Sequence, residues 1–241
     1  MINVLHLYYD LLNLYGENAN TRSIKYNLEL NNIKTKVDLK SINDNINFDK
    51  YDIIYIGSGS EDNIELVIKD LLKRKDDFVK YINSNKYLFL TGNSMCLFGK
   101  YIDTLNGKID ALDIFDYYTE YIKEGLDKTA NKTTILGEIK ADCNLINKKI
   151  IGFQNRCDLI HNVKTPLFKT DINYSNDLKN KNEGFTYKNV YATHTIGPLF
   201  IRNPYLLDYF LNKICKEKEL KYNSLDKTAK DAYKKYLENF N

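Results

Sequence analysis

Short apolar runs recur along the first hundred residues of the chain and are separated by amphipathic or polar segments. The runs INVLHLYY (2–9), DIIYIGSGS (52–60) and KYLFLTG (86–92) are rich in β-branched, aromatic or leucine residues. They are too short for helices, so we interpret them as strands buried on both faces. The segment IKTKVDLKSI (33–42) alternates apolar and polar positions, which predicts an outer strand of the same sheet.

The segments between these predicted strands have the apolar spacing of helices. The segments 61–73 and 76–84 are amphipathic, and a helix capped by Asn20 or Thr21 is expected to run to about residue 30. The sequence SMCLFGKYI (94–102) predicts a further helix after the third core strand. Strands that alternate with helices indicate a parallel, doubly wound sheet, whose ligands bind beyond the carboxyl ends of the strands.

The second half of the chain has a different pattern. The segments 132–142, 148–163 and 184–197 read as strands joined by polar turns, which predicts a second, more antiparallel sheet or layer. An amphipathic helix follows over 203–218, with Asn203 as its cap and Pro204 at its first position. A terminal helix capped by Ser224 ends the pattern.

These elements predict one α/β domain over residues 1–241, with a flavodoxin-like sheet flanked by helices and extra antiparallel strands in its second half. We expect a doubly wound part over about 1–105, a strand-rich part over about 106–215 and a C-terminal helix over 216–241. No linker long enough to divide the chain occurs.

Composition excludes several classes of function. The net charge is +3 without a long basic run, so we expect no nucleic-acid partner. The four cysteines have neither a C-x-x-C pair nor metal-ligand spacing, so no metal or other cofactor is expected and a reducing cytoplasmic location fits best. No apolar run approaches the ~20 residues that span a membrane. YGENAN (15–20) lacks the glycine patterns of phosphate-binding loops, which favours simple helix entry.

The most informative segment is FLTGNSMCLFG (89–99). A buried strand that enters a tight turn and then a helix is how many α/β enzymes present a nucleophile. Here the tip of the turn is Gly92, and Cys96 lies one helical turn further along. Glycine adopts the strained elbow conformation without a Cβ penalty.

Several segments together resemble one family, the CobB/CobQ-type class I glutamine amidotransferases. The resemblance covers about residues 3–213, and the ordered set is more specific than any single piece. The segments are DLLNLYGENANT (10–21), DIIYIGSGSEDN (52–63), LFGKYI (97–102), DYYTEY (116–121), IIGFQN (150–155) and THTIGPLFIRNP (193–204).

The resemblance implies that an elbow cysteine attacks the amide of glutamine, that a histidine moves the proton, and that backbone N–H groups hold the oxyanion. Ammonia then passes to a partner. The nearest resemblance is to subunits that work with a MurT-like, Mur-ligase-type protein to amidate a cell-wall precursor, so a heterodimer with such a ligase is expected. Cobyric-acid-synthase-like amidotransferases are the alternative within the family.

The two catalytic positions of the family motifs carry different residues in this sequence. Gly92 stands where the family has its cysteine, and Ile196 stands where it has its histidine. Cys96 and His194 are therefore candidates for a displaced dyad, although a cysteine in such a segment is more often a core residue. A shift of one residue would instead put Thr91 at the elbow.

The segments that border the substrate pocket in the family are retained in part. We expect substrate binding by the following residues: Gly57, Ser58, Gly59, Asn93, Asp116, Thr119 and Gln154. The sequence thus predicts an amidotransferase-like subunit whose own glutaminase is relaxed or replaced. The alternatives are a catalytically inactive binding or scaffold subunit, and an unrelated doubly wound module that binds a nucleotide or flavin.

Overall fold

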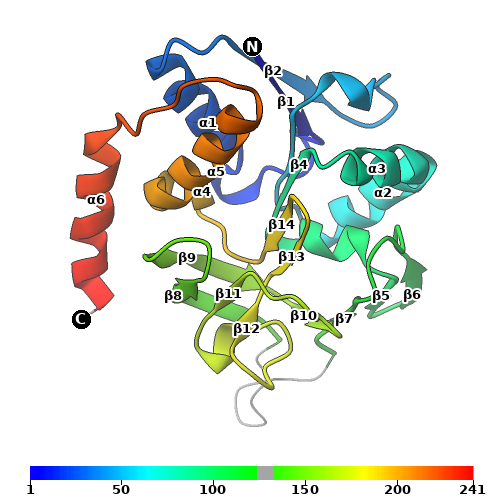
Figure 1. The fold of residues 1–241 in the computed structure, drawn as a ribbon. Coiled ribbons are helices and arrows are strands. Elements are labelled where there is room, and N and C mark those ends of the chain that lie inside the picture. The colour runs from blue at the N-terminus through cyan, green and yellow to red at the C-terminus, as the bar shows by residue number, and fades with distance from the viewer. Residues whose placement is uncertain (124–132, 241) are drawn as a thin grey trace.

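A computed structural model of the chain describes residues 1–123 and 133–240. Lys132, the first residue of the strand predicted over 132–142, lies outside the described residues. The described residues form a central six-stranded sheet flanked by helices, with two smaller four-stranded sheets at one end (Figure 1). This arrangement confirms the predicted α/β class.

The central sheet is parallel except at one edge, where β13 runs antiparallel to β14. Because the carboxyl ends of parallel strands meet at one edge of a sheet, the loops that follow these strands come together there. In spatial order the strands are β13 (Phe185–Tyr187), β14 (Val190–Thr193), β4 (Tyr87–Thr91), β3 (Ile53–Ile56), β1 (Ile2–Leu7) and β2 (Thr35–Lys40).

Helices cover both faces of the central sheet, because alternate residues of its strands point to opposite sides (Figure 1). Leu88 and Leu90 of β4 belong to the same buried cluster as Phe78, whereas Phe89 packs against Phe210, with ring centroids 4.8 Å apart. The helices are α1 (Asn18–Leu30), α4 (Leu199–Arg202) and α5 (Pro204–Glu217) on the Phe210 side, and α2 (Glu61–Leu71) and α3 (Lys75–Asn83) on the Phe78 side.

The two smaller sheets are built mostly from the second half of the chain. One contains β10 (Asp158–His161), β7 (Tyr118–Tyr121), β5 (Tyr101–Thr104) and β6 (Gly107–Asp110), in that order. The other is antiparallel and contains β12 (Asn182–Glu183), β11 (Phe168–Lys169), β8 (Ile135–Cys143) and β9 (Lys149–Arg156). Short 3-10 turns complete the fold at Leu14–Gly16, Phe48–Lys50, Leu72–Arg74, Gly92–Phe98, Ile172–Tyr174 and Glu238–Phe240.

Two predictions about strands and helices are wrong for the same reason, long-range backbone pairing. The segment 184–197 supplies β13 and β14, which join the central sheet through β4 and not the second sheet. The helix predicted over 94–102 is a 3-10 turn followed by β5. The carbonyl oxygens of Leu97 and Phe98 accept hydrogen bonds from the backbone N–H groups of Leu112 and Phe115, so they cannot continue a helix.

The predicted helix caps also need correction. α1 begins at Asn18, before the predicted caps Asn20 and Thr21. α6 (Lys227–Leu237) is capped by Asp226, whose carboxylate accepts from the N–H of Ala229 at 3.0 Å, and not by Ser224. The residue before α1, Glu17, makes no cap hydrogen bond, and the N–H of Asn18 donates to Asn13 Oδ1 at 2.7 Å instead.

Asn203 occupies the N-cap position of α5, as predicted, but its side chain joins two parts of the fold. Pro204 occupies the first position of that helix, as predicted, but the Asn203 side chain makes no cap hydrogen bond. It accepts from the N–H of Ile151 at 2.8 Å and donates to the carbonyl oxygens of Ile151 at 2.7 Å and Leu199 at 2.8 Å. It therefore ties β9 to the helices of the central sheet.

Replacing Asn203 with alanine is expected to lower the free energy of unfolding by about 2–4 kcal/mol, because the buried N–H and C=O of Ile151 lose their partners. Urea denaturation followed by circular dichroism measures the change. Asn106→Ala, at an exposed turn between β5 and β6, is the control and should stay within about 0.5 kcal/mol of the parent chain. An equally small effect of Asn203→Ala would contradict the bridging role.

Candidate functional site

The sharp turn after β4 is the centre of the candidate site. Gly92 follows the strand directly and has a left-handed backbone, with φ +63°. A Cβ atom placed on Gly92 would lie 2.4 Å from Ser58 Oγ, 2.5 Å from Ser58 Cβ and 3.1 Å from Ile196 Cγ2. The backbone thus has the strained shape of a nucleophile elbow, while the Ser58 side chain fills the space that an elbow side chain would need.

The altered positions 92 and 196 are therefore neighbours in space. A cysteine at 92 and a histidine at 196 would meet, which is the geometry that a thiol and its base require. Thr91, the alternative elbow residue, is buried, and its hydroxyl bonds to Tyr55 and Glu17. The tip of the turn is Gly92, and no reactive side chain projects from it.

The glycine turn after β3 faces the elbow at close range. A Cβ on Gly57 would lie 2.4 Å from Leu12 O, and one on Gly59 would lie 2.4 Å from Leu12 Cδ2. Only glycine fits at both positions. The Ser58 carbonyl accepts from the N–H of Leu14 at 2.9 Å, so the turn is held against the loop that follows β1.

Asn93 bonds directly to this glycine turn. Its Oδ1 accepts from the N–H of Gly59 at 3.0 Å and from Ser58 Oγ at 3.2 Å. Its Nδ2 donates to the carbonyl oxygen of Gly59 at 2.7 Å. The structure therefore brings together four of the predicted substrate-binding residues: Gly57, Ser58, Gly59 and Asn93.

Cys96 and His194 have no access to a ligand in this structure. Both are about 1 % exposed, and burial raises the pKa of the Cys96 thiol well above its ordinary range. His194 Nε2 lies 3.2 Å from Asp158 Oδ2, and its Nδ1 lies 3.4 Å from Glu183 Oε1. The imidazole thus faces two carboxylates, and this geometry does not favour a displaced dyad.

His194 belongs to a buried ionic cluster, which we define as Arg156, Asp158, Glu183 and His194. Burial alone would raise the pKa of Asp158, but His194 and Arg156 reverse this effect and lower it. Gln154, a predicted substrate-binding residue, is fully buried and accepts from Arg156 Nε at 3.1 Å. Its place in the structure is beside the ionic cluster.

A cavity of about 340 Å³ opens beside the elbow. Gly59, Asn93 and Asn155 line it, and Asn155 Nδ2 donates to Tyr15 Oη at 2.7 Å. Cys157, which the sequence assigns to no site, also lines it and donates to Glu61 Oε1 at 3.1 Å. Burial and the Glu61 carboxylate raise the pKa of the Cys157 thiol, so this thiol is protonated at neutral pH.

Glu17 is the residue of this region that sequence reasoning missed. It is fully buried, and its Oε2 accepts hydrogen bonds from Tyr55 Oη and Thr91 Oγ1. Burial raises the pKa of Glu17 to about 7, although these two hydrogen bonds oppose the shift. Its position in YGENAN, directly before α1, was the only local signal.

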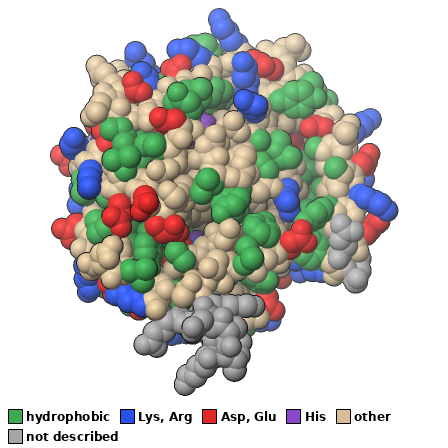
Figure 2. Space-filling view, turned by 180° about the vertical axis from the view of Figure 1, so that it is seen from behind, with side chains coloured by type: hydrophobic (Ala, Val, Ile, Leu, Met, Phe, Trp, Pro, Cys, Tyr) green, Lys and Arg blue, Asp and Glu red, His purple; other side chains and the backbone are tan. Residues whose placement is uncertain are grey.

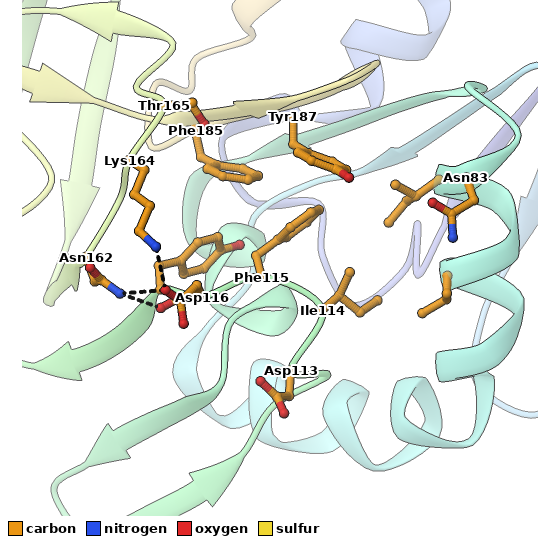
Figure 3. A pocket seen from close by; sticks show the side chains of 13 residues that line it. Asn83, Asp113, Ile114, Phe115, Asp116, Asn162, Lys164, Thr165, Phe185 and Tyr187 are labelled. Carbon is orange, nitrogen blue, oxygen red and sulfur yellow. Dashed lines mark hydrogen bonds and ion pairs between the residues drawn. The ribbon is translucent and has the colours of Figure 1, made fainter.

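Asp116 and Thr119 lie apart from the elbow cavity. Thr119 is fully buried in β7. Asp116 is exposed and pairs with Lys100 at 2.5 Å and Lys164 at 2.9 Å. It lines a separate cavity of about 520 Å³, in which the rings of Phe115, Phe185 and Tyr187 lie opposite Asn83 of α3 (Figure 3). This cavity shares no lining residue with the elbow cavity.

The described residues contain neither a cluster of metal ligands nor a membrane-spanning helix. Within residues 1–123 and 133–240, no group of three or more His, Cys, Asp or Glu side chains could hold a metal ion. None of the described helices is long and apolar enough to cross a membrane. On the rear face, positive and negative side chains alternate around the edge (Figure 2).

The chain belongs to the family of CobB/CobQ-like glutamine amidotransferase domains, whose sequence model matches residues 3–204. The elbow turn at Gly92 and the glycine turn at 57–59 both lie within the matched residues. The predicted family is confirmed.

Two curated relatives are similar over most of the chain. The GatD subunit of lipid II isoglutaminyl synthase (glutamine-hydrolyzing) from Staphylococcus aureus is 30 % identical, and the match covers 98 % of this chain and 94 % of that protein. The subunit of the same name from Streptococcus pneumoniae is 28 % identical over 90 % of this chain and 82 % of its own length. The chain is thus a GatD-like glutamine amidotransferase subunit.

A solved structure supports the fold alone. The crystal structure of a glutamine amidotransferase from Thermotoga maritima superposes with a TM-score of 0.53 at 12 % identity. The match covers 97 % of this chain and 92 % of that one.

The contact between positions 92 and 58 gives a direct test of the elbow. Gly92→Ala is expected to lower the free energy of unfolding by about 2–4 kcal/mol, because the new methyl group overlaps Ser58 and strains a left-handed backbone. In the double variant with Ser58→Gly, the overlap with Ser58 disappears, and the backbone cost of about 1–2 kcal/mol and the close contact with Ile196 remain. A thermodynamic cycle from urea denaturation measures the coupling. Additive effects of the two changes would contradict the contact.

The raised pKa of Glu17 predicts a pH dependence of stability. A raised folded-state pKa gives a contribution that is fully present below about pH 4.5, the ordinary value for a glutamate, and is lost as the pH rises through about 7. Between these limits, Glu17→Gln should gain about 3 kcal/mol of stability relative to the parent chain. Urea denaturation across this range tests it, with exposed Glu29→Gln as the control. Parallel pH profiles for the parent chain and Glu17→Gln would contradict the assignment.

Proposed function

We propose that this chain is the amidotransferase-fold subunit of a two-protein complex that amidates a cell-wall precursor, and that it does not itself hydrolyse glutamine. The partner is a MurT-like, Mur-ligase-type protein, which would bind ATP and the acceptor. The names of the two curated relatives support the assembly and its substrate class. The observation that carries the second part is the left-handed Gly92 packed against Ser58 and Ile196.

Hydrolysis of glutamine by this family's mechanism requires a thiolate at the elbow, because a carboxamide carbon is a poor electrophile. Gly92 supplies no nucleophile, and Ile196 supplies no nitrogen to carry a proton. The methyl groups of Ile196 and the hydroxymethyl group of Ser58 close the space in which the covalent intermediate would form. The residues at positions 58, 92 and 196 together therefore support a subunit that does not hydrolyse glutamine.

The other nucleophiles near the turn do not replace the missing thiol. The Thr91 hydroxyl is bonded to a carboxylate and a phenol in the core. The thiols of Cys96 and Cys157 both have raised pKa values, whereas an attacking thiol needs a lowered one. In this proposal the nitrogen reaches the partner as free ammonia, or from a separate glutaminase, and the subunit's role is to bind and stabilise the ligase.

The test is an assay of glutamate formation from glutamine, with the chain alone and co-purified with a Mur-ligase-type partner. We expect at least about 10³-fold less glutamate than from the Staphylococcus aureus GatD complex assayed in parallel, because the nucleophile is absent. Amidation by the complex should depend on ammonium and not on glutamine. Glutamate formation that is lost in Cys96→Ala would contradict the proposal and assign the displaced dyad instead.

A further inference from the structure

The Asn93 side chain occupies the glycine turn in the way that a ligand carboxamide would. A carboxamide has one acceptor and one donor group, and the backbone of Gly59 offers a partner to each. The Gly59 N–H donates to Asn93 Oδ1 at 3.0 Å, and the Gly59 C=O accepts from Asn93 Nδ2 at 2.7 Å. The opposite amide orientation would place donor against donor and acceptor against acceptor, so the pairing fixes the orientation.

The carbonyl oxygen of this side chain also has a second donor. Ser58 Oγ donates to Asn93 Oδ1 at 3.2 Å, so two donors from the glycine turn converge on one carbonyl oxygen. Two preorganised donors on a carbonyl oxygen are what an amide-cleaving site uses to hold the developing oxyanion. Here both donors are satisfied from within the chain.

The position of Asn93 makes this occupation effective against free ligands. The residue follows the elbow directly, is half-buried, and lines the 340 Å³ cavity through which a ligand would reach the turn. A group held covalently beside its binding partner competes at a high effective concentration, and a dissolved carboxamide would have to displace three hydrogen bonds.

We propose that Asn93 is the specificity-determining residue of the elbow cavity, an internal carboxamide that excludes ligands carrying a primary carboxamide, such as glutamine. The inference rests on the proposed function, because it concerns the same site. It explains why glutamine would not bind there, whereas the missing thiol explains why glutamine would not be hydrolysed. Removal of the Asn93 amide then leaves the N–H and C=O of Gly59 free to bind an added carboxamide.

Isothermal titration of L-glutamine into the full chain and its variants tests the inference. Asn93→Ala is expected to bind glutamine at least about tenfold more tightly than the parent chain, and L-glutamate should bind that variant less tightly because it cannot donate to the Gly59 carbonyl. Asn93→Asp keeps an acceptor for both donors but places its second oxygen against the Gly59 carbonyl, so its affinity for glutamine should lie between those of the parent chain and Asn93→Ala. Asn155→Ala removes another half-buried amide from the same cavity and is the matched control, with no gain expected.

A second readout reports on the turn itself. In amide hydrogen exchange by NMR, the Gly59 N–H should exchange faster in Asn93→Ala than in the parent chain or in Asn155→Ala, because its acceptor has been removed. Equal glutamine affinity of the parent chain and Asn93→Ala, or no binding by Asn93→Ala, would overturn the inference. Glutamate formation is measured in the same samples and decides the proposed function separately.

Discussion

The left-handed backbone of Gly92, wedged between Ser58 and Ile196, is the contact on which the rest of the site depends. Loops from three strands of the central sheet meet at this one residue. The absence of a side chain lets the glycine turn approach, and that approach brings Ser58 and Gly59 within reach of Asn93. The close contact of Gly92 with Ser58 and the absence of a nucleophile at position 92 therefore have the same cause, the missing side chain.

The sequence predicted those elements whose signal is local. The core strands and the helices α2 and α3 follow from short apolar runs and amphipathic spacing, and the elbow position followed from an ordered set of family segments. The helix predicted over 94–102 failed because the carbonyl groups of its residues pair with a segment more than ten residues away. The sequence also did not predict that β14 pairs with β4, because strand partners a hundred residues apart leave no local pattern.

The residues of the two turns could be predicted from the sequence more easily than the buried polar residues behind them. Gly57, Ser58, Gly59 and Asn93 lie in two motifs that the family pattern aligns, so their meeting could be predicted. The burial of Glu17 could not, because its partners Tyr55 and Thr91 come from two separate strands. Asp116 was expected at the same pocket, but it lies in the loop that joins β6 to β7 and lines the separate cavity of about 520 Å³.

The buried ionic cluster has a mechanical consequence for the whole molecule. Asp158 belongs to one small sheet, Glu183 to the other, and His194 directly follows β14 of the central sheet. If any one sheet moved away, charged groups would lose their counter-charges in a nonpolar interior, which costs several kcal/mol. The cluster thereby couples the three sheets, and we expect them to unfold together and not one before the others.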